Sequence, residues 1–162
     1  MCMKENLMVP KIPIDLSVIE QENLYLKIHK INKSSKIRII NYKLLFNGLP
    51  TNRKFKNRYS QKCFMCNKII DEDKEHTFVN CNQTKLFYNY IRVEYLRNKK
   101  LENSIELLQY KDKVDDEDFK ILSIFVYTVW RIRNMSIYEN AFDCQIVFKI
   151  LFGKWLLSKA MI

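Results

Sequence analysis

Three cysteines and a histidine lie close together in the middle of this chain. They are Cys63, Cys66, His76 and Cys81, in the pattern C-x2-C-x9-H-x4-C, and they use three of the five cysteines and one of the two histidines among 162 residues. Thiolate and imidazole are the ligands that tetrahedral Zn²⁺ prefers, and a Cys₃His set leaves no open position for a catalytic water. The pattern predicts a closed structural Zn²⁺ site, and it favours a binding module over a metalloenzyme.

The alternative interpretation is a group of buried free thiols beside a solvated histidine, because motif matches carry false positives. The spacing adds a local prediction. Cys63 and Cys66 bracket a tight turn, and a helix begins near Lys74. His76 and Cys81 are five residues apart, which is about 140° around an ideal helix. Both cannot face one metal from a straight helix, so the helix should loosen or end just before Cys81.

Composition favours helices. Gly is 2 and Pro is 3 in the chain, too few for an all-β protein full of tight turns. We expect a mainly α fold, with a small Cys-Cys-His-Cys zinc knuckle embedded between helices and a C-terminal helical extension. The predicted organisation is an N-terminal entry and helix (1–33), basic helices with the zinc module (34–98) and the extension (99–162). The expected helices are 15–30, 36–46, 52–59, 86–97 (with Leu86, Phe87, Tyr90, Val93 and Leu96 as its apolar stripe), 101–110, 115–139 and 143–159.

The cysteine pattern does not resemble a disulfide framework. We therefore expect a reducing, intracellular compartment, the nucleus or the cytoplasm. Residues 1–17 contain no apolar run followed by a cleavage site, so no signal peptide is predicted. The longest apolar stretches, Ile121–Trp130 and Ile146–Phe152, are too short to cross a bilayer. No membrane partner is expected.

Charge is unevenly distributed. The net charge is +10, and the 48 residues from Asn23 to Ile70 hold twelve Lys or Arg and no Asp or Glu. A segment of one sign that leads into a metal site is typical of a polyanion binder. The plainer alternative is that the lysines only solvate helix faces. Tyr42, Phe55, Tyr59 and Phe64 lie in this segment and could stack on unpaired bases, although packing is the commoner fate of such rings. The predicted nucleic-acid contacts are Lys36, Arg38, Lys43, Arg53, Lys54, Lys56, Arg58, Lys62 and Lys68.

Two further groups of residues have competing interpretations. The run Asp115–Asp118 suggests a nuclease, but two-metal sites take carboxylates from separate elements, so a favourable interaction with a helix dipole is the better explanation. Arg131, Arg133 and Asn134 could contact phosphate or pair with acidic residues of the chain. Trp130 and Trp155 are expected to anchor the packing of the last two helices.

About two thirds of the chain resembles the zinc-binding region at the C-terminal end of non-LTR (LINE-type) retrotransposon reverse transcriptases. The resemblance rests on a basic apolar stretch, a Leu-Pro-Thr break at Leu49–Thr51, a basic segment, the CxxC turn, an acidic loop and the H-x4-C ending. Farther on, Trp130–Asn134 is similar to the family's W-x-x-R-N stretch. Asn67 replaces a common Gly, and Phe87 or Tyr88 replaces a usual Trp. Asn tolerates the left-handed conformation, so the turn is expected to form.

The resemblance implies a module that holds template RNA or target DNA near a polymerase. The polymerase itself is missing, since the chain has no aromatic-x-Asp-Asp motif, and no catalytic residue carries over. We therefore expect a zinc-dependent module that binds RNA or DNA and is not an enzyme. The alternative is a protein-interaction or structural module, held together by zinc, whose C-terminal helices bury a protein partner. An exposed apolar patch on those helices would favour that alternative.

Overall fold

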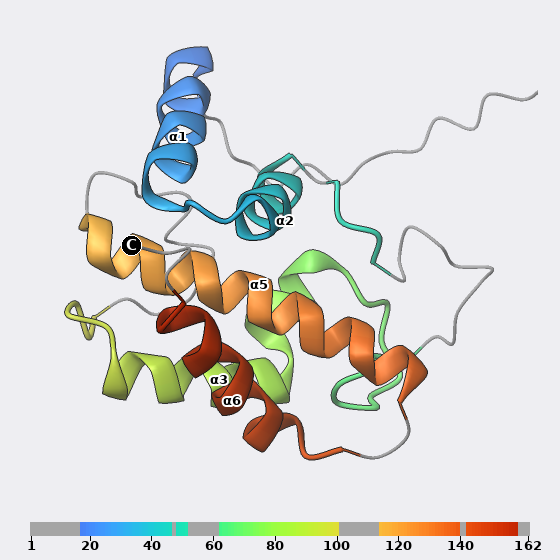
Figure 1. Ribbon diagram of the computed structural model, residues 1–162. Coiled ribbons are helices and arrows are strands. Elements are labelled where there is room, and N and C mark those ends of the chain that lie inside the picture. The colour runs from blue at the N-terminus through green and yellow to red at the C-terminus, as the bar shows by residue number, and fades with distance from the viewer. Residues whose placement is uncertain (1–16, 47, 52–61, 101–113, 140–141, 159–162) are drawn as a thin grey trace, which may run out of the picture.

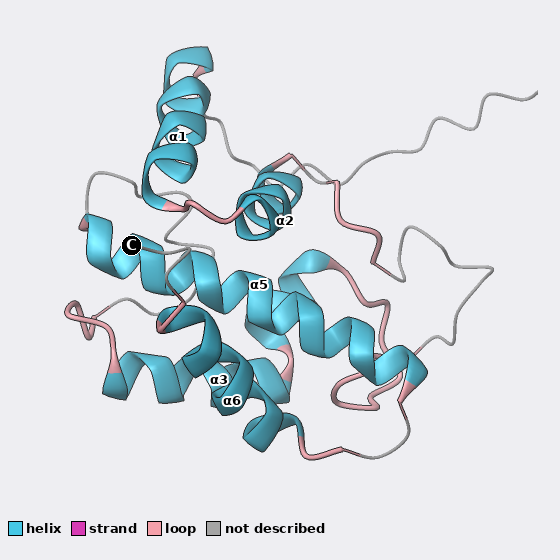
Figure 2. Ribbon diagram, viewed as in Figure 1, coloured by secondary structure: helices cyan, strands magenta, loops and turns pink. Residues whose placement is uncertain are grey.

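The computed structural model describes residues 17–46, 48–51, 62–100, 114–139 and 142–158. One long helix runs through the middle, with two helices on one side and two on the other (Figure 1). Helices dominate the described residues, and the bridge between Lys62 and Ile69 is the one pairing of extended backbone found there (Figure 2). The predicted fold class is confirmed. The elements are α1 (Val18–Ile31), α2 (Ser35–Leu45), the π turn η2 (His76–Asn80), α3 (Asn82–Glu94), α5 (Asp116–Tyr138) and α6 (Cys144–Leu156).

α5 occupies the centre because it is buried on every side. All ten residues of Ile121–Trp130 are buried, as expected of a helix with neighbours all round. α1, α2, α3, α6 and η2 each pack against it. Its start and end agree with the sequence prediction, since Asp115 and Glu139 are its cap residues. The prediction for the last helix also holds at its start, where the Asp143 side chain accepts hydrogen bonds from the first turn of α6.

The acidic start of α5 does more than complement the helix dipole. Asp115 accepts the backbone N–H of Asp118 at 2.8 Å and caps the helix. Asp118 is buried, and its carboxylate accepts the N–H groups of Arg97 and Asn98 at 2.8 and 2.9 Å. It thereby holds the residues that follow α3 against the start of α5. Neighbouring carboxylates turn outward, where Glu117 pairs with Arg97 at 3.6 Å.

α1 and α2 form a corner that packs on α5 through one face of each helix. The helix expected over residues 15–30 begins at Val18, because Ser17 caps it in a capping box with Glu20. Leu24 and Ile28 of this helix are buried. The buried Asn41 of α2 donates to the Ser123 carbonyl of α5 at 3.0 Å. This bond fixes α2 on the central helix through a backbone carbonyl of α5.

The predicted apolar stripe of α3 is partly wrong. Leu86 and Val93 are 49% and 57% exposed, and the helix ends at Glu94, not near Arg97. Its buried face is formed by Phe87 and Ile91 together with Thr84 and Tyr88. The difference has a physical cause: α3 packs against α5 and α6, and the ring of Phe87 stacks on Phe148 of α6 with centroids 4.5 Å apart. These contacts decide which side of α3 is buried, and they cannot be inferred from the periodicity of the sequence.

Two predicted helices, 52–59 and 101–110, lie outside the described residues. No helix in the described part of the chain is long and apolar enough to cross a membrane.

Candidate metal centre

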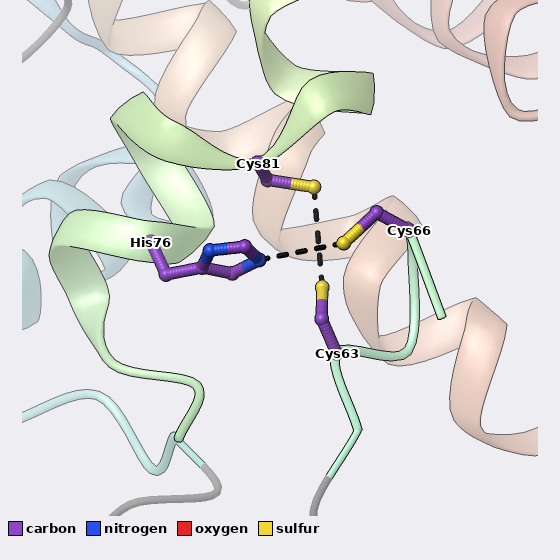
Figure 3. Close-up of side chains that lie close together, drawn as sticks. All are labelled: Cys63, Cys66, His76 and Cys81. Carbon is purple, nitrogen blue, oxygen red and sulfur yellow. Dashed lines mark hydrogen bonds between the residues drawn. The ribbon is translucent and has the colours of Figure 1, made fainter. Parts of the chain in front are cut away.

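The four predicted ligands come from three places on the chain and meet at one point. Cys63 and Cys66 lie in the turn that opens the knuckle, which we define as residues 62–82. His76 is the first residue of η2, and Cys81 directly precedes α3. Their side chains converge (Figure 3), and their donor atoms all lie within 4.8 Å of one another. The cluster is therefore assembled in a form that could hold one metal ion.

Two of the donor–donor distances match those around a tetrahedral ion. With Zn–S of about 2.3 Å and Zn–N of about 2.05 Å, a regular tetrahedron has S···S edges of about 3.8 Å and S···N edges of about 3.6 Å. The Sγ atoms of Cys63 and Cys81 are 3.9 Å apart, and Cys66 Sγ lies 3.6 Å from His76 Nε2. These two contacts cross each other in Figure 3, as opposite edges of a tetrahedron do. The cysteines are free thiols in this structure, so the donor set fits a metal and no disulfide competes for it.

The five-residue gap between His76 and Cys81 is accommodated by a widened helical turn. η2 is a single π turn, closed by a hydrogen bond of 2.7 Å from the Cys81 N–H to the His76 carbonyl. In this i→i+5 geometry residue i+5 lies close above residue i, so His76 and Cys81 reach the same side. Cys81 then becomes extended, with ψ at 130°. The predicted loosened end is confirmed, although the loosening already starts at His76.

The CxxC turn has the expected conformation. The Asn67 N–H donates to the Cys63 carbonyl at 2.9 Å, and the Cys63 N–H donates to the Lys68 carbonyl at 3.0 Å. Asn67 adopts a left-handed φ of 57°. Asn is one of the few residues besides Gly that visit this region routinely. The exchange of Gly for Asn noted in the sequence is therefore compatible with the turn.

A hydrogen bond between their sulfur atoms links the buried Cys63 and Cys81. A hydrogen bond with Cys63 lowers the pKa of Cys81 to about 4 against the effect of desolvation, and His76 acts in the same direction. The pKa of Cys63 is raised far above its ordinary range by its hydrogen bond with Cys81 and by burial. A metal ion takes thiolates, so binding must release the protons that the three cysteines still carry. Metal affinity should consequently rise with pH.

A buried ion pair ties the knuckle to α5. Both Arg133 Nη2 and Arg133 Nε donate to Glu72 Oε1, at 2.6 and 3.0 Å, and the two side chains are 3% and 0% exposed. A third donor, Arg133 Nη1, contacts the Asn134 side chain at 3.1 Å. Of the two interpretations of Arg133 from sequence, pairing within the chain is therefore the one seen in the structure.

Aromatic rings surround this pair. The Arg133 guanidinium lies 4.9 Å from the ring centroid of Trp130 and 5.3 Å from that of Phe64. Trp130 also stacks on Phe78 of η2 at 6.3 Å. The expectation that the tryptophans join the last two helices is confirmed for Trp155, which packs on Tyr127 of α5. The ring contacts of Trp130 are with Phe78 and Arg133, so this residue holds the knuckle.

The predicted nucleic-acid contacts fall into two described groups, one on α2 and one on the knuckle. The segment that links them lies outside the described residues. Lys36 and Lys43 on α2 and Lys62 and Lys68 on the knuckle are exposed, Arg38 is half-buried, and Arg53, Lys54, Lys56 and Arg58 belong to the segment that is not described.

Sequence reasoning missed the role of Glu72. It lies in a run of charged residues, Asp71–Glu75, and such runs are usually solvated. No periodicity marks it as buried. The W-x-x-R-N stretch supplied half of the contact, but its partner could be found only from the tertiary structure.

No family model, curated protein or solved structure matches this chain.

We predict one tetrahedral metal site per chain. Titration with Co²⁺ should give the intense visible absorption of tetrahedral cobalt, with thiolate charge-transfer bands, and saturate at one equivalent. Cys81→Ser should abolish this spectrum, because it removes one of four donors. Cys144→Ser is the matched control: Cys144 is a half-buried free cysteine outside the cluster, so its loss should leave the spectrum unchanged. An unaltered spectrum in Cys81→Ser would contradict the assignment.

Removing only one member of the Glu72–Arg133 pair should strongly lower the free energy of unfolding. Arg133→Met leaves a carboxylate buried without its charge partner, and we expect a loss of about 3–5 kcal/mol in the free energy of unfolding. Glu72→Met/Arg133→Met should lose less than the sum of the two single variants. Chemical denaturation monitored by tryptophan fluorescence measures both.

The matched control is Arg97→Met. Its partner is Glu117, and the two side chains are 68% and 58% exposed. Exposed pairs contribute at most about 1 kcal/mol. Equal losses in Arg133→Met and Arg97→Met would refute a special role for the buried pair.

Proposed function

We propose that this chain is a non-catalytic module, organised by Zn²⁺, that binds RNA or DNA. The proposal relates it to the zinc-binding C-terminal region of non-LTR retrotransposon reverse transcriptases, on the motifs quoted from its sequence. The observation that carries the proposal is a set of exposed cations in a stretch of chain without acids. The zinc cluster holds the turn of the knuckle, which carries some of these cations.

The donor chemistry supports zinc. Three thiolates and one imidazole that converge on one point suit Zn²⁺ better than Mg²⁺ or Ca²⁺, which prefer oxygen. Four protein donors close the coordination sphere, so the site would stabilise the fold and offer no water for hydrolysis. The carboxylates at the start of α5 diverge, with Asp118 committed to two backbone N–H groups. These features support a module that binds and does not catalyse.

The exposed lysines support a polyanionic partner. Lys30 and Lys33 flank the α1–α2 corner, Lys36 and Lys43 lie on α2, and Lys68 lies on the knuckle; all five are exposed. None forms an ion pair with a described residue. Binding of such lysines to phosphates releases condensed counterions, which supplies affinity without sequence preference.

Binding to a single strand should depend steeply on salt. For about five neutralised phosphates, log K against log salt should fall with a slope of roughly −3.5. Neutralising two contacts in Lys36→Gln/Lys43→Gln should make the slope shallower by about 1.4. Fluorescence anisotropy with a labelled oligonucleotide across a salt series measures this. Repeating the titration after chelation tests whether the metal organises the surface.

The control for net charge is Lys85→Gln/Lys154→Gln. These lysines are exposed on α3 and α6, which lie across α5 from α2 (Figure 1). The same loss of two charges should leave the slope unchanged. If the affinity of the wild-type protein does not depend on salt concentration, the proposed phosphate contacts are wrong.

A second candidate function is protein binding through α6. Ile146, Ile150 and Leu157 are 58%, 63% and 83% exposed, and their spacing of four and seven residues aligns them on one side of the helix. Gly153 lies in the same stripe, where an added Cβ would meet no heavy atom within 4 Å. The sequence predicts a partner surface on the C-terminal helices as a group. Because α5 is buried, the candidate surface is now confined to α6.

If a second copy of the chain covers this stripe, the protein should associate as its concentration rises. Ile146→Glu/Ile150→Glu should remain monomeric, because it places charges in an apolar contact. Sedimentation velocity over a range of concentrations measures both. Ile39→Glu, at a 52% exposed position on α2, is the matched control. A wild-type monomer at every concentration would exclude a second copy as the partner.

A further inference from the structure

Four aromatic side chains form a continuous row across the α1–α2 corner. Tyr25 and His29 come from α1, and Tyr42 and Phe46 come from α2 and its C-cap. The ring centroids are 4.3 Å apart for Tyr25–His29, 5.0 Å for Tyr25–Tyr42 and 4.5 Å for Tyr42–Phe46. Each helix contributes a pair four residues apart, which is the spacing of neighbours on one helix face. We call these four rings the ring row.

The ring row is on the outside of the molecule. Tyr25, Tyr42 and Phe46 are 37%, 36% and 49% exposed, and His29 is exposed as well. The core contacts of both helices are made by other residues. Leu24, Ile28, Ile37 and Leu44 are all at most 2% exposed. The rings therefore do not serve the packing of α1 and α2 on α5.

The row is held in place without a partner. Tyr25 Oη lies 3.4 Å from His29 Nε2, which aligns the two rings on α1. The corner between the helices is short, and the buried Asn32 closes it with a bond from its Nδ2 to the Ile28 carbonyl at 3.3 Å. Tyrosine and phenylalanine have few rotatable bonds, so rings that are already ordered lose little entropy when they bind.

The α1–α2 corner that carries the row also carries exposed lysines. Lys30 and Lys33 lie at the corner, and Lys36 and Lys43 lie on α2, all exposed. Glu22, one turn before Tyr25, is the acid closest in sequence. An apolar protein surface would fit the rings but would gain nothing from these lysines. A ligand whose flat apolar groups are joined by phosphates would contact both the rings and the lysines.

We propose that the ring row is a stacking surface for the unpaired bases of a single-stranded nucleic acid. The inference rests on the proposed function and narrows it to single strands. Aromatic rings stack on the π faces of bases, which a duplex hides between neighbouring base pairs. Stacking tolerates any base, so the surface adds affinity without sequence preference. The lysines would hold the phosphates on either side of the row.

The test compares a labelled dT12 strand with a 12-base-pair duplex in fluorescence anisotropy. Tyr42→Leu/Phe46→Leu keeps apolar volume and helix propensity but removes two stacking faces. Affinity for the strand should fall about tenfold or more, as expected from the loss of stacked bases. Affinity for the duplex and the salt slope should not change, because no lysine is altered. Circular dichroism should show an unchanged fold.

Tyr138→Leu is the matched control, since Tyr138 is 81% exposed at the end of α5 and outside the row. It should bind both nucleic acids as the wild type does. Photo-crosslinking of a 4-thiouridine strand should map to peptides that contain Tyr42 and Phe46.

Failure of the inference and failure of the proposed function give different results. If the wild type binds strand and duplex and the double variant loses neither, the stacking surface is overturned while nucleic-acid binding stands. If the wild type binds neither form at low salt, the proposed function falls and the inference falls with it. If the double variant instead abolishes self-association of the wild type, the row is a protein contact and the inference is overturned.

Discussion

The position of the knuckle on the helical body depends on the buried ion pair between Glu72 and Arg133. Removing two charges from water costs several kcal/mol per ion, and only good geometry with further hydrogen bonds offsets that cost. Here two guanidinium nitrogens bind one carboxylate oxygen, and the Asn134 side chain takes another donor. Such a pair is weak evidence for stability but strong evidence for one docking geometry. It fixes the loop between Cys66 and His76, so the two halves of the ligand set are held in place by contacts other than the metal.

Local chemistry made much of the site predictable. The ligand set follows from residue types and spacing, and the loosened helix end follows from the angle between His76 and Cys81. The limits of α5 follow from a capping Asp115 and an unbroken apolar run. In each case the governing forces act within a few residues along the chain, so the sequence contains them.

Long-range contacts explain what the sequence did not reveal. The phase of α3 is set by Phe148, some sixty residues away from Phe87. The burial of Glu72 depends on Arg133, 61 residues farther along. The ring row joins two helices whose pairs, Tyr25–His29 and Tyr42–Phe46, look like ordinary surface positions when each is taken alone. Such features need the tertiary structure because neither partner carries a local signal.

The two candidate binding surfaces lie across α5 from each other, with the ring row on α1 and α2 and the apolar stripe on α6 (Figure 1). One chain could therefore engage a nucleic acid and a protein at the same time without steric conflict. The knuckle contacts the central helix α5, and its Cys81 leads directly into α3. Its metal would thus influence more of the fold than the residues it binds.

The π turn also limits how the length of this chain can vary among related sequences. Between His76 and Cys81, Thr77 accepts a 2.6 Å hydrogen bond from Thr84, Phe78 stacks on Trp130, and the closing bond spans the whole segment. A residue inserted or deleted here would misplace a ligand and two packing contacts together. Ile70 and Asp71 are exposed and lie outside this turn. Relatives of this chain should keep the number of residues between His76 and Cys81.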